Sequence, residues 1–146
     1  MLDCTLNTPI GVLHSIVFTA GIDDGKPGTI SSPTTQQLNS YFNKELHEFD
    51  LNMETQGTVF QNRVWSKLKE IPYGQTITYE QLAIRLGDKK LTRAVANSNS
   101  KNPLPIVIPC HRVVGKKGDL TGYLGGIDRK RWLLKHEGAL KQISLF

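Results

Sequence analysis

The sequence predicts an α+β protein with two portions, a small strand-and-helix portion over residues 1–56 and a mainly helical portion over residues 57–146. The first portion holds one apolar, β-branched segment and one segment with helical periodicity. The second portion opens on helix-capping signals that are followed by apolar residues at helical spacing. Charge divides at the same place: the first portion carries two basic and seven acidic residues, and the second carries sixteen basic and six acidic residues.

Length and composition set the limits of the prediction. A chain of 146 residues forms one domain, or one domain with a small appendage. It contains no apolar run of the roughly 18 residues that a transmembrane helix requires, and its first residues lack the basic start and apolar stretch of a signal peptide. We therefore expect a cytoplasmic protein whose two cysteines, Cys4 and Cys110, are free thiols. No role is predicted for Cys4.

The first portion is predicted to contain a strand, a loop and a helix, in that order. Residues 10–18 are apolar and β-branched, as in a strand, and residues 21–35 are rich in turn-forming residues without periodicity. Residues 36–49 predict a helix, and residues 50–57 a connector. The apolar residues at helical spacing are Leu38, Tyr41, Phe42, Leu46 and Phe49.

The second portion begins with two helices that have matching start signals. Thr58 with Gln61 forms one capping box, and Thr78 with Gln81 forms another. The sequence "IPYG" is expected to end the first of these helices, because it contains a proline and a glycine. The apolar faces predicted for the two helices are Phe60, Val64, Leu68 and Ile71 in the first, and Leu82, Ala83 and Leu86 in the second.

A third helix is predicted from about residue 90 to residue 101, with Ala94, Val95 and Ser98 facing inward. It follows the second helix after a tight turn at Gly87. Two helices joined in this way within a basic region are typical of a helix-turn-helix, although an ordinary helical corner gives the same pattern. A basic surface favours nucleic acid as the partner, while a solvated lysine-rich face remains the alternative.

The stretch "NPLPIVIPCHRVV" places one cysteine after a stiff, apolar segment. Three prolines disfavour a helix there and push the preceding residues toward extended backbone, so Cys110 is expected at the end of a rigid, buried segment. A glycine-rich loop over residues 114–126 and a last helix over residues 128–138 follow, and Gly138 is the stop signal of that helix.

The residues around Cys110 predict thiol chemistry. A free cysteine has a pKa of about 8.5 and reacts as the thiolate, so it needs a nearby base or positive charge. His111 and Arg112 follow directly, and Glu137 and Asn102 are candidates for the group that orients the base. A buried structural cysteine beside a surface histidine is the alternative. The remaining histidines and Cys4 have no metal-ligand spacing, so no metal site is predicted.

Several ordered motifs resemble the O6-alkylguanine-DNA alkyltransferase family, the methylated-DNA–protein-cysteine methyltransferases. They are "GTVFQNRVWSKLKEIPYGQTITYEQLA", "RAV", "NP", "IPCHRVVG", "LTGYLGG" and "LLKHEG", and the resemblance is continuous from about Gly57 to Ala139. The first third is similar only through "TPIGVL" and "QLNSYF…EL…FDL". The resemblance implies a reduced N-terminal α/β domain over residues 1–56, and an alkyltransferase domain over residues 57–146 with a helix-turn-helix of winged-helix-like form.

The resemblance implies a DNA repair protein that acts once per molecule. Cys110 would take the alkyl group from O6 of a damaged guanine, in an irreversible and stoichiometric transfer. His111 would act through a water as the base, Glu137 would hold the tautomer of His111, and Asn102 would organise the same hydrogen-bond network. No metal or organic cofactor is implied. The expected partner is double-stranded DNA containing O6-alkylguanine, bound by a monomer without strong sequence preference and with no membrane contact.

The target atom lies inside the duplex, so the nucleotide must be flipped out of the stack. By the resemblance, Arg93 would fill the vacated space, and Tyr79 would rotate the 3′ phosphate and protonate the departing guanine. The main-chain carbonyls of Cys110 and Val113 would accept from the guanine amino group. The residues assigned to DNA or substrate contact are Tyr79, Arg93, Arg112, Val113, Tyr123 and Leu124, of which Tyr123 and Leu124 would close the pocket.

The chain differs from the family pattern at a few positions. Ala96 stands where the family usually has glycine, Ser98 where it has alanine, and Leu124 where some members have a small polar residue. Three other functions stay open. A binding-only alkyltransferase-like protein would lack the cysteine, a thiol hydrolase would turn over esters or peptides without DNA, and a helix-turn-helix regulator would bind one DNA sequence tightly.

Overall fold

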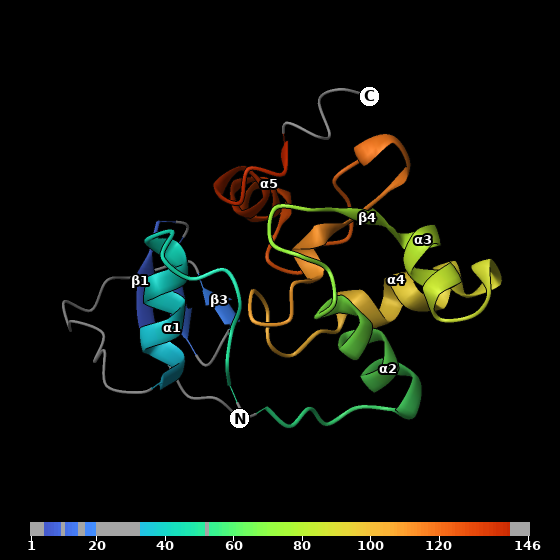
Figure 1. Ribbon diagram of the computed structural model, residues 1–146, viewed down its shortest axis with the longest axis horizontal. Coiled ribbons are helices and arrows are strands. Elements are labelled where there is room, and N and C mark those ends of the chain that lie inside the picture. The colour runs from blue at the N-terminus through green and yellow to red at the C-terminus, as the bar shows by residue number, and fades with distance from the viewer. Residues whose placement is uncertain (1–4, 10, 15–16, 20–32, 52, 141–146) are drawn as a thin grey trace. The chain divides into compact units, whose positions relative to one another are not determined.

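The computed structural model describes two compact units of the chain, Met1–Glu54 and Thr55–Phe146 (Figure 1). The predicted loop over residues 21–35 falls largely outside the described residues, and Cys4 falls outside them entirely. No helix in the described part of the chain combines the length and the apolar character that a membrane crossing requires. The described residues are 5–9, 11–14, 17–19, 33–51 and 53–140.

The first unit pairs a three-stranded sheet with one helix. Strands β1 (Thr5–Thr8), β2 (Gly11–His14) and β3 (Val17–Thr19) are antiparallel in that order, and α1 (Pro33–Phe42) lies against β1. The single strand predicted over residues 10–18 is therefore wrong, because this stretch contributes β2 and β3. An apolar run does not encode where a chain reverses, and two short antiparallel strands satisfy each other's backbone groups.

Helix α1 begins at Pro33, inside the predicted loop over residues 21–35, and is shorter than the predicted helix over residues 36–49. Proline is favoured at the first position of a helix, where an N–H would have no partner. The helix ends at Phe42, and Lys44 adopts a left-handed φ of 62° that no helix can continue through.

The chain then turns back along the helix, where the Gln37 side chain accepts from the backbone N–H of Asp50 and donates to its carbonyl, at 2.8 and 2.7 Å. The Phe49 ring returns to within 5.7 Å of the Tyr41 ring. The helical spacing of Phe49 thus reflects packing on α1 and not membership of it.

The second unit is a cluster of helices with one short parallel strand pair. Helix α4 (Thr92–Ser100) packs against both α2 (Val59–Leu68) and α3 (Tyr79–Arg85), and α5 (Ile127–His136) closes the described chain (Figure 1). Strand β4 (Ile77–Thr78) pairs in parallel with β5 (Val113–Val114). Three 3₁₀ turns connect these elements, at Lys89–Leu91, Cys110–Arg112 and Lys116–Gly118.

The predicted inward face of the third helix is correct at two of three positions. Val95 and Ser98 are buried, but Ala94 is exposed. Asn99 is buried in its place, because residues 95, 98 and 99 share one face at helical spacing while Ala94 lies to its side. The apolar face predicted for the second helix is confirmed, since Leu82, Ala83 and Leu86 are all buried.

Both predicted capping boxes are confirmed. The Thr58 hydroxyl accepts from the backbone N–H of Gln61, and the Gln61 side chain accepts from the backbone N–H of Thr58. Thr78 and Gln81 make the same two bonds at the start of α3. These bonds satisfy backbone N–H groups that have no partner within the helix. They fix where α2 and α3 begin.

Replacing Thr58 with alanine is expected to lower the free energy of unfolding by about 1 kcal/mol, because a backbone N–H at the start of α2 loses its acceptor. Chemical denaturation followed by circular dichroism measures the change. Thr58→Ser keeps the hydroxyl and is the control, with most of the stability retained. Equal losses in both variants would show that the methyl group of Thr58 matters, and not the cap.

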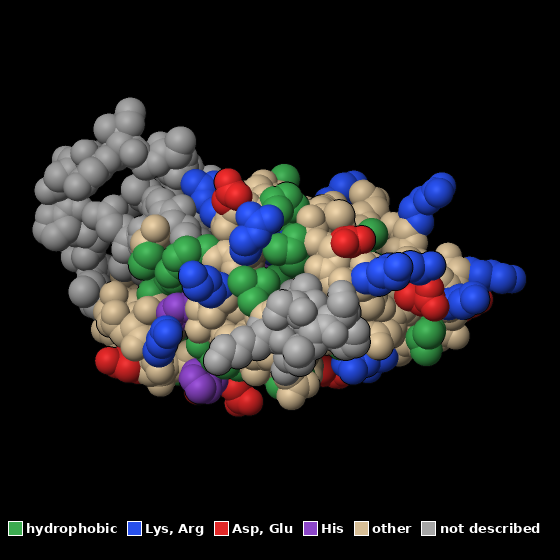
Figure 2. Space-filling view, turned by 90° about the horizontal axis from the view of Figure 1, so that it is seen from above, with side chains coloured by type: hydrophobic (Ala, Val, Ile, Leu, Met, Phe, Trp, Pro, Cys, Tyr) green, Lys and Arg blue, Asp and Glu red, His purple; other side chains and the backbone are tan. Residues whose placement is uncertain are grey.

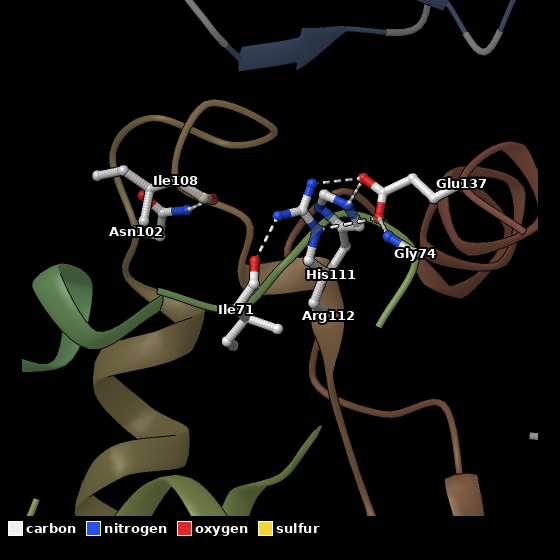
Figure 3. Close-up of polar contacts among 7 residues, drawn as sticks. All are labelled: Ile71, Gly74, Asn102, Ile108, His111, Arg112 and Glu137. Atoms are coloured by element: carbon white, nitrogen blue, oxygen red, sulfur yellow. Dashed lines mark hydrogen bonds and ion pairs between the residues drawn. The ribbon is translucent and has the colours of Figure 1, made fainter. Parts of the chain in front are cut away.

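The segment before Cys110 is buried as predicted but is not extended throughout. Residues 106–108 are almost fully inaccessible, yet Ile106 has a left-handed φ of 73°, which is rare for a β-branched residue. The Asn102 amide holds this turn, since it donates to the Ile108 carbonyl at 2.7 Å (Figure 3). It also accepts from the Leu104 N–H at 3.0 Å. Proline spacing predicts stiffness, but the turn itself depends on Asn102.

Candidate active site

Cys110 is the first residue of the 3₁₀ turn Cys110–Arg112, which leads directly into β5. Its side chain is buried, with only 5% of the residue exposed. Burial raises the pKa of the thiol, while hydrogen bonding by Asn102 and the positive charge of Lys130 oppose that rise. Cys110 is therefore a protonated thiol at neutral pH, and its use as a nucleophile requires a base.

His111 is a fully buried imidazole that is fixed by Glu137. Its Nε2 lies 2.7 Å from Oε1 of Glu137 (Figure 3). A carboxylate only accepts, so Nε2 carries the proton and Nδ1 is left with a free lone pair. Nδ1 is buried and has no hydrogen-bond partner among the described residues. Burial lowers the pKa of His111 even though Glu137 acts to raise it, so the ring is a neutral base with one accepting nitrogen.

Glu137 is the centre of a buried polar network. Besides His111, its carboxylate accepts from Arg112 Nε at 2.9 Å, from Arg112 Nη2 at 3.0 Å and from the Gly74 N–H at 3.2 Å (Figure 3). Burial by itself would raise the pKa of Glu137, but the charges and hydrogen bonds of His111 and Arg112 hold it well below its usual range. The residue caps the C-terminus of α5, and the left-handed Gly138 follows it.

Arg112 does not lie where a residue in contact with DNA is expected. Its side chain is buried, with two nitrogens on Glu137 and Nη1 donating to the Ile71 carbonyl at 2.7 Å. The guanidinium is also 5.7 Å from the centre of the Tyr73 ring. The DNA or substrate contact predicted for Arg112 thus has no support from its position. Arg112 instead neutralises Glu137 and ties α5 to the chain that follows α2.

Tyr79 and Tyr123 face the same site from different elements. Tyr79 begins α3, and its hydroxyl donates to the Thr121 carbonyl at 3.0 Å. Tyr123 is buried, and its hydroxyl has no hydrogen-bond partner among the described residues. Burial raises the pKa of both phenols, and negative charge on Cys110 raises them further.

The remaining predicted residues divide into buried and exposed ones. Val113 is fully buried beside Cys110. Arg93 is exposed on α4, and Leu124 is exposed by 81% on the loop after Tyr123. The structure thus gathers Cys110 and the groups that interact with it at one place, while Arg93 and Leu124 face solvent. The gathered residues are Cys110, His111, Asn102, Glu137, Tyr79, Val113 and Tyr123.

Lys130 belongs to the site but was not predicted. It is fully buried on α5, and Nζ donates to the carbonyls of Val113 at 2.6 Å and Thr121 at 2.7 Å. Burial lowers its pKa to about 8, and the charge of an ionised Cys110 opposes that change. Its spacing from the buried residues Leu133 and Leu134 places it on the inner face of α5, which is the sequence signal that could have identified it.

Within the part of the chain that the structure describes, no group of three or more histidine, cysteine, aspartate or glutamate side chains is arranged to hold a metal ion. The polar network consists instead of a thiol, an imidazole, a carboxylate, a guanidinium and an ammonium group. This set can form a thiolate and stabilise it. It is suited to nucleophilic attack by sulfur.

Residues 59–139 match the family model described as 6-O-methylguanine DNA methyltransferase, DNA binding domain. Over 105 residues, the chain is 50% identical to the methylated-DNA–protein-cysteine methyltransferase of Methanosarcina acetivorans, covering 72% of this chain and 67% of that protein. The enzyme of the same name from Mycobacterium bovis is 50% identical over 111 residues, covering 76% of this chain and 67% of that protein. The matches therefore span about two thirds of these relatives' length.

Solved structures show the same similarity. The Mycobacterium tuberculosis O6-methylguanine methyltransferase superposes with a TM-score of 0.80 at 40% identity, covering 95% of this chain and 94% of that chain. Mycobacterium tuberculosis OGT in complex with DNA superposes with a TM-score of 0.71 at 50% identity, covering 73% of this chain and 66% of that chain. The mixture of helices with small sheets is thus shared with these structures.

Proposed function

The chain belongs to the 6-O-methylguanine DNA methyltransferase family, and from this premise we propose that it repairs DNA by moving the alkyl group of O6-alkylguanine onto Cys110. The observation that carries the proposal is the fixed base beside the thiol. His111 keeps a buried Nδ1 free of any partner among the described residues, while Glu137 holds its other nitrogen. A neutral imidazole in this tautomer is ready to accept the thiol proton.

The proposed reaction is a direct displacement at carbon. The thiol proton passes through a water to Nδ1 of His111, and the imidazolium that forms is stabilised by Glu137. The sulfur of Cys110 then bonds to the alkyl carbon while the bond from that carbon to O6 breaks, and the electron pair stays on the guanine. Tyr79 donates a proton to the departing base. The thioether is stable, so each molecule reacts once.

DNA binding is assigned to the second unit, which carries sixteen basic and six acidic residues. We propose that α3 and α4 form a helix-turn-helix of winged-helix type, with Arg93 on α4 placed to enter the base stack. Among the described lysines and arginines of this unit, only Arg112 and Lys130 are buried. On the face shown in Figure 2, basic side chains are scattered and not gathered in one stripe. Contacts from basic side chains to phosphates position a protein on DNA without reading the base sequence.

The pocket for the flipped base is assigned to the groups around Cys110. The carbonyls of Cys110 and Val113 accept from the guanine amino group, and the loop with Tyr123 and Leu124 closes over the base. Val113 already accepts from Lys130, but a carbonyl oxygen has two lone pairs and can accept again. We also expect a cytoplasmic monomer, and double-stranded DNA with O6-alkylguanine as its substrate.

Intact mass spectrometry after mixing with a duplex that contains one O6-methylguanine tests the proposed function. We expect a gain of one methylene unit, located on the Cys110 peptide and absent in Cys110→Ala. No gain with DNA binding retained would instead favour the binding-only function, which the presence of Cys110 argues against. No gain in mass and no DNA binding would contradict both the alkyl-transfer and the binding-only function, and would favour a thiol hydrolase.

A further inference from the structure

The hydroxyl of Tyr79 is held by the main chain of the loop that follows β5. It donates to the Thr121 carbonyl at 3.0 Å. The same carbonyl accepts from the Lys130 ammonium at 2.7 Å, so both of its lone pairs are in use. Nζ of Lys130 also lies 3.5 Å from the Tyr79 oxygen. The phenol, the carbonyl and the ammonium group therefore form one cluster.

A glycine at position 122 lets the loop come this close to the phenol. Gly122 has a left-handed φ of 68°, and a Cβ atom built on it would lie 3.0 Å from the Tyr79 oxygen. That approach is closer than a Cβ ordinarily makes, and the positive φ would also strain a larger residue. The contact with the hydroxyl is therefore built into the backbone of the loop.

The phenol of Tyr79 has a single proton to donate. In the proposed function that proton goes to the departing guanine, so it must point at the base when the sulfur attacks. In this structure the proton lies on the Thr121 carbonyl instead. Tyr79 cannot donate to both acceptors, and the bond to Thr121 must therefore break before Tyr79 acts on the base.

Lys130 limits the free-energy cost of breaking that bond. When the Tyr79 hydroxyl leaves, the Thr121 carbonyl keeps the hydrogen bond from the ammonium and is not left without a donor. An acceptor that loses every donor costs far more than one that loses one of two. The change at Thr121 is therefore limited to a single neutral hydrogen bond.

We propose that the hydrogen bond from Tyr79 to the Thr121 carbonyl is a latch, which stays closed while the protein scans DNA and opens when a flipped base enters the site. The inference rests on the proposed function. A base that remains in the stack does not reach Tyr79, so scanning leaves the latch closed. A flipped base accepts from the hydroxyl, and Lys130 then holds the Thr121 carbonyl alone. The cost of opening arises only at a flipped nucleotide and opposes the capture of bases that bind weakly.

Weakening the Thr121 carbonyl tests the proposal without a change to any side chain. Glycolic acid in place of Gly122 converts the peptide bond after Thr121 into an ester, whose carbonyl is a weaker acceptor. Binding is measured in Cys110→Ala, so that no transfer occurs. We expect the ester to tighten binding of a duplex with O6-methylguanine by about twofold to fivefold, at most the size of one neutral hydrogen bond. Binding of the undamaged duplex should not change.

Tyr79→Phe separates the latch from other effects of the ester. This variant keeps the ring but has no hydroxyl to release, so the ester should not change its binding to either duplex. An ester at Gly125, three residues further along the same loop, is the matched control. It alters the Leu124 carbonyl and should leave the binding of both duplexes by Cys110→Ala unchanged.

Crystal structures of Cys110→Ala with each duplex give a second measurement. With O6-methylguanine, the Tyr79 oxygen is expected beyond hydrogen-bond distance of the Thr121 carbonyl, with Nζ of Lys130 still bound to it. A hydroxyl that stays on Thr121 in that complex would overturn the inference and leave the proposed function intact. So would an ester at Gly122 that has no effect, or one whose effect persists in Tyr79→Phe. Failure of the wild type to methylate Cys110 would overturn both together.

Discussion

Replacing Glu137 with glutamine is expected to lower the free energy of unfolding by about 3 kcal/mol, since breaking a buried ion pair leaves its partner charge uncompensated. Arg112 would keep its positive charge in a buried position, with an amide in place of the carboxylate that neutralises it. The glutamine could also offer an N–H toward Nε2 of His111 and so favour the wrong tautomer. We therefore expect alkyl transfer to slow by about a hundredfold or more, as when catalytic groups are misoriented.

Urea denaturation and single-turnover transfer rates measure the two effects of Glu137→Gln. The matched control is Glu70→Gln, which removes a carboxylate from the exposed pair with Lys67. Pairs of that kind contribute about 1 kcal/mol or less, so this control should change little. Comparable losses in both variants would contradict a special role for the network around Glu137.

Lowering the pH is expected to reduce the stability that the buried network around Glu137 provides. The pKa of Glu137 is lowered on folding, so its contribution to stability is present above the unfolded pKa of about 4.3 and is lost as pH falls toward the folded value. The lowered pKa of His111 acts in the same direction, because the unfolded chain takes up its proton at about pH 6.5, before the folded protein does. Stability should fall from about pH 6.5 downward, and the fall below pH 4 should be shallower in Glu137→Gln.

Replacing Lys130 with methionine is expected to slow alkyl transfer by about tenfold or more, a typical loss for one charged hydrogen-bond donor. The ammonium opposes the rise that burial causes in the pKa of the Cys110 thiol, and it donates to the carbonyls of both Val113 and Thr121. Methionine fills a similar volume but supplies neither the charge nor the donors.

Two readouts distinguish the charge of Lys130 from its packing. Alkylation of Cys110 by iodoacetamide as a function of pH reports the thiol pKa, which should rise in Lys130→Met. The stability of the wild type relative to Lys130→Met should increase as pH rises through about 8, because the folded wild type releases the Lys130 proton there while the unfolded chain keeps it. The difference is the quantity to measure, because the raised pKa of Cys110 acts in the opposite direction in both proteins. Lys135→Met, exposed on the same helix, is the control, and identical behaviour of the two variants would refute the assignment.

Local signals predicted much of the second unit correctly. Thr58 with Gln61 and Thr78 with Gln81 fixed two helix starts, because a capping box depends only on residues three positions apart. From the residues alone, Glu137 was one of two candidates to orient His111, with Asn102. Only the resemblance selected it, since His111 and Glu137 are 26 positions apart. The first unit was harder to predict, since the end of α1 depends on Lys44 and on the contact from Gln37 to Asp50.

The residues that sequence reasoning missed or misplaced owe their positions to tertiary packing. Lysine and asparagine are usually exposed, so Lys130 and Asn99 carry no individual signal of burial. The two residues are buried because they lie on the side of their helix that faces the core. Which side that is becomes certain only when the neighbouring helices are known. Arg112 differs from its prediction for the same reason, because the acceptors that hold it come from Ile71 and Glu137, far away in sequence.

The raised pKa of the buried Cys110 has a consequence for the lifetime of the unused protein. Peroxide and other oxidants attack the thiolate, so a shielded, protonated sulfur is oxidised slowly. A protein that reacts once per molecule cannot recover a copy whose sulfur has been lost to oxidation. An unreacted molecule therefore keeps its thiol intact. The number of unreacted molecules in the cell then limits how many lesions can be removed before more protein is synthesised.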